Sequence, residues 1–528
     1  MHNPSKQRLP MTRLSTVAAL LTMVFAGSGH AADPRLSGAR LSLLDSVQVA
    51  LARNPTVMSS GRQVEIARGQ LQQTQGAFDT LVSASVTNQR THTPSTTADQ
   101  QSAGDGADAV VSDQTNGSLK LSQLLRNGVT IEPAITISRS SDSSALSQST
   151  PLPNRATVGV NVTIPLQRNP GADGAAVSER AAELELQATR LDQTQTLSQA
   201  TLSAVSAYWS YLAAEKARQA AANAERSSQQ RTSDTNKLVE AEIIPAADRD
   251  LVDADGASKR SARIAAEQSL EEARAALARA MGLSPQEAHS LPLPEEEFAN
   301  APPPNADLQL ERMRELALKQ RADLQAVQLR YGQAEITLDA TRKSLKPQLD
   351  LVLGVGVSGL QEGNSYANYF GSANSNLKGP NASVGLNYQF PVQNRNAIGQ
   401  LVQKQGALDQ LAISRQDLQS SIQISIETLS NSVYRLGLQL TQAKTSVDLY
   451  AKSVENEEIR RKMGRSTLIE VLNVQDRLLQ AQQTFTNVQL NYSVAIAQLR
   501  YACGAFFQSD PQATDGLQLN RSSLTTPP

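Results

Sequence analysis

The sequence predicts a mixed α/β membrane protein with two internal repeats, in which pairs of β-strands continue into long coiled-coil helical hairpins. Three observations predict this class. The N-terminus reads as an export signal, several segments alternate apolar and polar residues, and other very long segments lack proline. A similar order of segments occurs in each half of the chain, over about two hundred residues.

The N-terminal segment 1–32 has the three parts of a secretory signal peptide. Lys6, Arg8 and Arg13 form a basic start, an apolar run follows from Leu14 to Phe25, and small residues precede a predicted cleavage after Ala31 or Ala32. The run is too short to span a membrane comfortably, which argues against a membrane anchor. No cysteine follows the cleavage site, so a lipoprotein anchor is not expected.

Composition excludes several classes of protein. The 528 residues carry a formal net charge of -1, so no basic face for nucleic acid is expected. The single cysteine, Cys503, excludes an intramolecular disulfide. Only His92 and His289 lie beyond the leader, far apart, which makes a His/Cys metal site or a Cys/His dyad improbable. We therefore expect no enzyme activity, no metal and no cofactor.

The repeat divides the mature chain. A first repeat spans residues 33–290, a proline-rich linker spans 291–307, a second repeat spans 308–505, and a polar tail spans 506–528. The tail is expected to be disordered after Asp510. Corresponding positions occur in the same order in the two repeats: Pro165 and Pro391, Asp248 and Glu470, and Gly282 and Gly504.

Each repeat contains a very long helical segment. No proline occurs at residues 171–244 or 392–510, and Ala, Gln, Leu, Glu and Arg are frequent there. A helix of about 65 residues would be roughly 100 Å long. Apolar residues alternate at spacings of four and three, which is the seam of a coiled coil: Ile422, Ile426, Leu429, Val433, Leu436 and Leu440. An ordinary cytosolic coiled coil would show the same seam.

About four principal strands are predicted, at residues 81–89, 158–164, 347–359 and 382–390. They are about ten residues long, which is enough to cross a bilayer when tilted, and they alternate apolar and small polar residues. A half-buried soluble sheet shows the same alternation. Four strands cannot close a barrel in one chain, whereas three copies would supply twelve.

A further pair of strands is predicted at residues 118–125 and 129–138. The segments are separated by a turn at Arg126, Asn127 and Gly128. The alternation does not decide whether this pair widens a barrel or forms an extracellular hairpin.

The chain resembles the TolC-like outer-membrane efflux protein family over roughly residues 41–504. The most specific segments are GRSTLIEVLNVQDRLLQAQ, from Gly464 to Gln482, and LNYSVAIAQLRYACG, from Leu490 to Gly504. The strand end FPVQNRN, followed by a long helix, supports the resemblance.

The resemblance implies a homotrimer with a shared twelve-stranded barrel in the outer membrane and an α-barrel that crosses the periplasm. Such a trimer serves as the exit duct of a drug efflux pump or a type I secretion system. Its expected partners are a periplasmic adaptor and an inner-membrane transporter, either a proton-driven RND-type pump or an ABC-type exporter. The duct itself performs no covalent chemistry.

The resemblance also assigns roles to the two hairpin tips. Adaptor docking is expected at Glu242, Ile243, Ile244, Pro245, Gly464, Ser466 and Thr467. The periplasmic entrance is expected at Asp248, Arg465, Glu470 and Asn473. Ser466 and Asn473 depart from the charged residues that the family usually has, so a less acidic entrance is expected. Without the resemblance, Glu470 would read as a solvated helix charge.

The remaining signals have structural explanations. We expect Tyr208, Trp209 and Tyr211 to pack between helices, and Cys503 to fill a small space near a helix end. Tyr366, Tyr369 and Phe370 are expected in an extracellular loop rather than in the aromatic girdle. Gly464 is expected to end a helix and Thr467 to cap the next one. The rival to the duct is an exported periplasmic coiled-coil scaffold without a pore.

Overall fold

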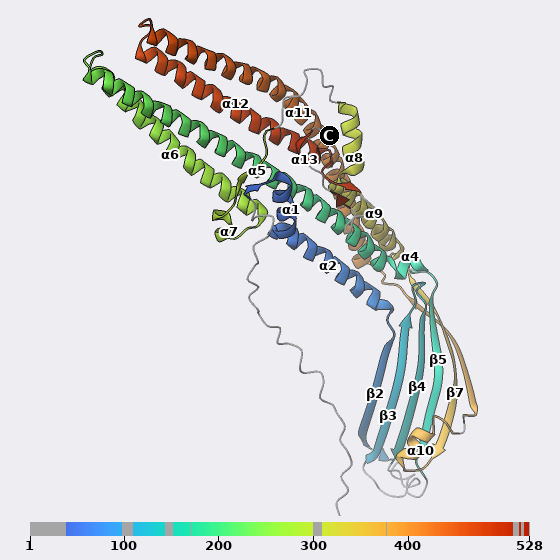
Figure 1. Cartoon of the computed structure of the whole chain (residues 1–528). Coiled ribbons are helices and arrows are strands. Elements are labelled where there is room, and N and C mark those ends of the chain that lie inside the picture. The colour runs from blue at the N-terminus through green and yellow to red at the C-terminus, as the bar shows by residue number, and fades with distance from the viewer. Residues whose placement is uncertain are drawn as a thin grey trace, which may run out of the picture.

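The computed structural model describes residues 39–94, 96–97, 109–142, 151–168, 171–298, 309–375, 377–509, 517–518 and 522–526. The predicted signal peptide lies outside these residues. The molecule is elongated, with a β-sheet at one end and the tips of two helical hairpins at the other (Figure 1). None of the helices in the described ranges is long and apolar enough to cross a membrane.

The two helical hairpins are built from the long proline-free segments. The first consists of α5 (Val177–Glu240) and α6 (Ala247–Met281), and the second of α11 (Arg395–Lys462) and α12 (Leu468–Ala502). α5 and α11 contain 64 and 68 residues, so each is about 100 Å long if straight. α6 and α12 contain 35 residues each, and each ends before a glycine with positive φ, Gly282 or Gly504. The predicted long helices are confirmed.

Shorter helices accompany the hairpins. α1 (Leu43–Arg53) and α2 (Pro55–Gln75) lie along α5, while α8 (Leu310–Gln320) and α9 (Ala322–Lys343) pack against α11. The remaining helical elements have three to six residues: the 3₁₀ turn Gly76–Phe78, α4 (Ala172–Ala175), α7 (Pro285–His289), α10 (Tyr366–Gly371) and α13 (Ser522–Thr525).

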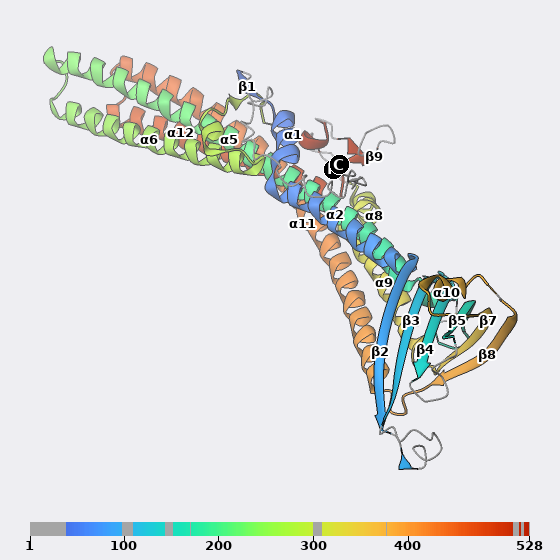
Figure 2. The same cartoon turned by 90° about the horizontal axis from the view of Figure 1, so that it is seen from below.

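A six-stranded antiparallel sheet forms the other end of the molecule (Figure 2). Its order is β2 (Leu81–Pro94), β3 (Ala109–Leu124), β4 (Thr130–Asp142), β5 (Pro153–Pro165), β7 (Gln348–Glu362) and β8 (Gly379–Gln389). Short strand pairs also form between β1 (Arg40–Leu41) and β6 (Leu293–Pro294), and between β9 (Gln508–Ser509) and β10 (Leu517–Gln518).

The sheet corrects the prediction of about four principal strands per chain. The additional pair of segments extends into β3 and β4, and these strands lie inside the sheet between β2 and β5. The turn between them is confirmed, with Gly128 at a φ of 85°. The alternation predicted the strands, but the neighbours of a strand depend on pairing that alternation does not encode.

The main core lies beside α5, halfway between the sheet and the tips. Tyr208, Trp209 and Tyr211 are almost fully buried there, as predicted, and Trp209 stacks on Phe298 of the linker at 5.6 Å between ring centroids. The Tyr208 hydroxyl lies against the Glu296 carboxylate, and burial raises its pKa far above the usual tyrosine value. The described part of the linker is therefore packed into the core.

A second core follows the predicted coiled-coil seam of α11. Ile422, Ile426, Val433 and Leu440 are buried against α8 and α12, which confirms the seam. Cys503 is fully buried in the same cluster, as predicted, and burial raises the pKa of its thiol to about 11.

One prediction about the segments outside the main elements is wrong in part. The sequence predicts disorder after Asp510, yet α13 is helical and its Leu524 is fully buried in the first core. Residues 510–516, 519–521 and 527–528 lie outside the described residues. Tyr366, Tyr369 and Phe370 lie in the connection between β7 and β8, and this connection contains helix α10. Tyr369 of α10 is buried against Ile137 and Ala156, whereas Tyr366 and Phe370 are exposed.

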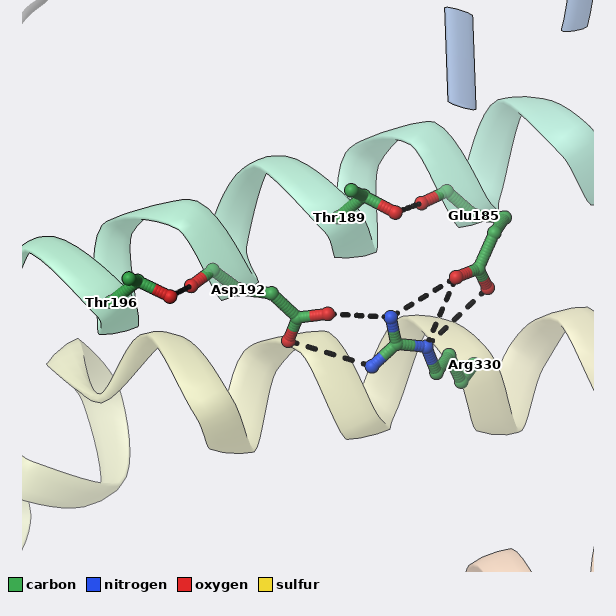
Figure 3. Close-up of polar contacts among 5 residues, drawn as sticks. All are labelled: Glu185, Thr189, Asp192, Thr196 and Arg330. Atoms are coloured by element: carbon green, nitrogen blue, oxygen red, sulfur yellow. Dashed lines mark hydrogen bonds and ion pairs between the residues drawn. The ribbon is translucent and has the colours of Figure 1, made fainter. Parts of the chain in front are cut away.

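A three-residue charge cluster joins the two repeats near the sheet. Arg330 of α9 lies between Glu185 and Asp192 of α5 and donates to both carboxylates, with Nη2–oxygen distances of 3.0 and 2.6 Å (Figure 3). Because Glu185 and Asp192 are seven residues apart, they lie on one face of α5, two turns from each other. The arginine therefore fixes the position of α9 along α5.

We predict that Gly282→Ala destabilises the protein more than Gly464→Ala. Both glycines have positive φ, so an alanine costs about 1 kcal/mol or more at either position. A Cβ at Gly282 would also lie 2.4 Å from the Arg53 carbonyl oxygen, whereas a Cβ at Gly464 would meet nothing within 4 Å. Thermal unfolding of the purified protein, followed by circular dichroism, should separate the variants by about 1–3 kcal/mol. Equal midpoints would contradict the close packing of Gly282 against α1.

Candidate functional site at the hairpin tips

The first tip connects α5 and α6 and exposes apolar residues. Glu242 adopts a φ of 57°, which turns the chain, and Ile243 is 67% exposed next to the half-buried Ile244 and the exposed Pro245. Asp248 lies in the first turn of α6. An apolar residue this exposed at the end of a helical hairpin is available for contact with another protein.

The second tip connects α11 and α12 and is organised by hydrogen bonds. Gly464 ends the reversal with a φ of 69°, and Thr467 caps α12 through its side chain, so both predictions are confirmed. Thr467 and Glu470 form a capping box, in which the Glu470 carboxylate accepts from the Thr467 backbone N–H at 2.8 Å. Arg465 and Asn473 are exposed.

The Glu470 side chain is held in place by hydrogen bonds from residues of the same tip. Its carboxylate accepts hydrogen bonds from the Thr467 backbone and from the hydroxyls of Ser466 and Thr467, which lower its pKa below the usual glutamate range. The Ser466 hydroxyl also contacts Glu457 of α11. Ser466 therefore joins the two helices of this hairpin through carboxylates on either side of the turn.

The two hairpins also contact each other close to the tips. Val252 of α6 packs against Leu468 and Leu472 of α12. Lys259 of α6 forms an ion pair with Asp476 of α12, although its side chain is only 12% exposed. These contacts bring the two tips into one site.

Lys259 belongs to a buried charge network that the sequence did not predict. It lies 3.5 Å from Asp255, which also accepts from Ser228 and Arg231 of α5. Burial alone would raise the pKa of Asp255, but the Ser228 hydrogen bond and the two cations bring it below its usual range. The only signal in the sequence was the i,i+4 spacing of Asp255 and Lys259, which is common on solvated helices.

Among the residues described, no group of three or more His, Cys, Asp or Glu side chains could hold a metal ion. The tip residues carry opposite charges and exposed apolar groups, and their hydroxyl and carboxylate groups bond mainly to one another.

Comparison with known proteins gives a family match for part of the chain. Residues 313–505 match the outer membrane efflux protein family. The outer membrane protein TolC of Salmonella enteritidis is 23% identical over 190 residues, which is 34% of this chain and 38% of that protein. The matched segment therefore spans less than half of the length of that relative.

Several solved structures share the fold over most of the chain. The outer membrane channel CmeC of Campylobacter jejuni is 15% identical, with a TM-score of 0.62 over 88% of this chain and 85% of CmeC. VceC of Vibrio cholerae is 14% identical, with a TM-score of 0.62 over 88% of this chain and 96% of VceC. MtrE of Neisseria gonorrhoeae, crystallised in an open state, is 16% identical, with a TM-score of 0.59 over 88% of both chains.

We predict that Thr467→Ala weakens the start of α12. The substitution removes the side-chain acceptor for the Glu470 N–H and costs about 1 kcal/mol. Hydrogen exchange at residues 468–471 should become faster. Thr484→Ala is the matched control, because the Thr484 hydroxyl only donates to a carbonyl within α12, that of Gln480.

The capping box should also respond to pH. Since the pKa of Glu470 is lowered in the folded protein, its stabilising effect is present above the usual glutamate pKa and is lost as the pH falls through the lowered value. Protection factors at residues 468–471, which compare each rate with the intrinsic exchange rate at the same pH, should fall in both cases. Factors that stay unchanged in the Thr467→Ala protein, or at acid pH, would contradict the capping role.

Proposed function

We propose that the chain forms an exit duct in the outer membrane, because residues 313–505 match the outer membrane efflux protein family, in agreement with the predicted resemblance. Three copies enclose one passage, which passively conducts substrates from an inner-membrane transporter across the periplasm and the outer membrane. The duct serves drug efflux or type I secretion.

The observation that carries this proposal is the division of one chain into two contrasting ends. The sheet has strands of 11–16 residues, which is enough for each to cross a bilayer, and one face with apolar side chains. The helices extend from it in one direction for about 100 Å and have polar surfaces between their buried seams. A scaffold without a pore would have no use for a lipid-facing sheet.

The tips supply the proposed entrance and docking site. Asp248, Arg465, Glu470 and Asn473 line the periplasmic opening in this proposal. A periplasmic adaptor docks on the surface that contains Glu242, Ile243, Ile244, Pro245, Gly464, Ser466 and Thr467. The exposed Ile243 is suited to such a contact, because burying it under a partner removes apolar surface from water. The inner-membrane partner is an RND-type or an ABC-type transporter.

The duct is tested with the full chain expressed in a Gram-negative host. We expect an outer-membrane trimer that migrates as a monomer after heating, and stepwise single-channel currents once the purified trimer is added to a planar lipid bilayer. Denatured protein in the same detergent is the control for leakage. A monomer released with the periplasmic fraction, without channel activity, would establish the scaffold function instead.

The entrance role of Glu470 is tested by Glu470→Gln. Glutamine can occupy the same position of a capping box, so this variant removes the charge and keeps the local fold. If three copies of the carboxylate surround the opening, their combined field favours cations, and Glu470→Gln should lower the cation-over-anion permeability ratio by about twofold or more.

Thr484→Ala is the matched control for this measurement, since it removes a hydroxyl of α12 that bonds only to the Gln480 carbonyl and leaves the Glu470 carboxylate and its partners unchanged. Its permeability ratio should equal that of the original protein. Reversal potentials in a salt gradient measure the ratio, and a Glu470→Gln channel with an unchanged ratio removes Glu470 from the entrance.

A further inference from the structure

The β3–β4 hairpin lies inside the sheet, between β2 and β5. β2 pairs with β3 along the whole length of β2, from Leu81↔Ser122 to Pro94↔Ala109. β4 pairs with β5 from Thr130↔Thr163 to Arg139↔Asn154. β2 and β5 do not pair with each other. Without the hairpin, both strands would lose a complete row of backbone hydrogen bonds.

The two faces of the hairpin match those of the neighbouring strands. On one face, Ile131, Pro133 and Ile135 of β4 lie opposite Val162, Val160 and Val158 of β5. On the other face, Glu132, Ala134 and Thr136 lie opposite Asn161, Gly159 and Thr157. This alternation continues from β5 into β7, where Val158 and Val160 lie opposite Val357 and Val355. One apolar face and one face of small and polar residues therefore extend across β4, β5 and β7.

The polar face of the hairpin also carries a charge pair. Lys120 of β3 lies 2.6 Å from Glu132 of β4, and Ser122 donates to the same carboxylate. An ion pair in a transmembrane wall belongs on the water-filled side, because hydrocarbon cannot solvate either charge. The pair therefore identifies the polar face as the lumen side.

Helix α10 joins the hairpin to the rest of the sheet at the end far from the long helices. The Tyr369 hydroxyl of α10 donates to the Ile137 carbonyl of β4 at 3.0 Å. Arg139 of β4 donates to the Asn154 side chain of β5 at 2.7 Å and to the Ser365 carbonyl at 2.8 Å. A hairpin that projected away from the sheet as a loop would not make these contacts.

The outer edges of β2 and β8 have no partner strand among the residues described. In hydrocarbon, an unpaired strand edge leaves backbone groups unsatisfied, at a cost of several kcal/mol each. Water cannot satisfy them there, so another strand must. Within a ring of identical copies, the β8 edge of one copy meets the β2 edge of the next.

We propose that three copies close an eighteen-stranded barrel, in which the β3–β4 hairpin of each copy is part of the lipid-facing wall and its Lys120–Glu132 pair faces the lumen. This inference rests on the trimer of the proposed function and specifies the partner of each sheet edge as a second copy of the chain. It replaces the twelve strands that the sequence suggested, because each copy contributes six.

The size of the barrel distinguishes the two strand numbers. With a strand spacing of about 4.8 Å and a tilt of about 40°, eighteen strands give a radius of about 18 Å and twelve strands about 12 Å. In a threefold ring, equivalent backbone positions are then separated by about 31 Å or about 21 Å, from the same spacing and tilt. A difference of this size can be measured between spin labels.

The first experiment measures distances between copies in the intact trimer by pulsed electron paramagnetic resonance. Spin labels are placed separately on Thr157→Cys and Val158→Cys, which lie on opposite faces of β5. One label-to-label distance between copies is then shorter than the distance between the equivalent backbone positions, and the other is longer. The buried Cys503 stays in place and the unsubstituted protein serves as the labelling control. We expect a mean of about 31 Å, the separation that the strand spacing and tilt give for eighteen strands.

The second experiment tests the place of the hairpin directly. In membranes, a charged, membrane-impermeant thiol reagent should label Thr136→Cys of β4 much faster than Ile135→Cys, and the Thr157→Cys and Val158→Cys pair of β5 provides the matched standard. Equally fast labelling of both β4 positions would place the hairpin outside the membrane and overturn the inference.

The outcomes separate this inference from the proposed function. A mean distance that matches the twelve-stranded ring overturns the eighteen-stranded barrel and leaves the duct intact. If the labelled protein gives no measurable distance between spin labels on different copies, the trimer is overturned, and the proposed duct with it. A mean that matches the eighteen-stranded ring, together with alternating labelling of β4, establishes both.

Discussion

The unpaired edges of the six-stranded sheet are the constraint on which the rest of the structure depends. Backbone N–H and C=O groups in hydrocarbon have no water to replace a missing partner, so an open sheet is not a complete membrane-spanning structure. Within the described ranges, the outer edges of β2 and β8 have no partner strand, so a single chain would be incomplete at this end in a bilayer. In the proposed duct, where the sheet lies in a bilayer, association of identical copies would pair both edges.

Association of copies through their sheets would also account for the polar outer faces of the long helices. If the sheets of several copies close into a ring, the helices that continue from them must also stand side by side around an axis. Their seams are buried within each chain, as Ile422 and Ile426 show, while Gln, Ser, Thr and Asn remain on the other faces. Such surfaces tolerate both contact with a neighbouring copy and contact with water, which a wall between an aqueous passage and the periplasm needs.

Much of this architecture could be predicted from local sequence, because the relevant signals lie close together in the chain. Absence of proline and the seam spacing indicated the long helices, alternation indicated the strands, and Gly464 and Thr467 indicated the second tip. The position of β3 and β4 within the sheet could not be predicted. Their alternation of apolar and polar residues fits strands in a barrel wall and strands in a separate hairpin equally well. The Lys259–Asp476 ion pair was also missed, because its members are 217 residues apart in sequence.

The tip shows how a residue assigned to a site can already have a local role. Glu470 completes a capping box, so its negative charge is drawn toward the N-terminus of α12 and the hydroxyls of Ser466 and Thr467. Those groups offset part of the charge that the opening would otherwise experience. Asn473, one turn further along, adds no charge of its own. An entrance built from these residues would therefore attract cations weakly, and its closure would depend more on contacts between hairpins, such as Lys259 with Asp476 and Val252 with Leu468, than on an acidic ring.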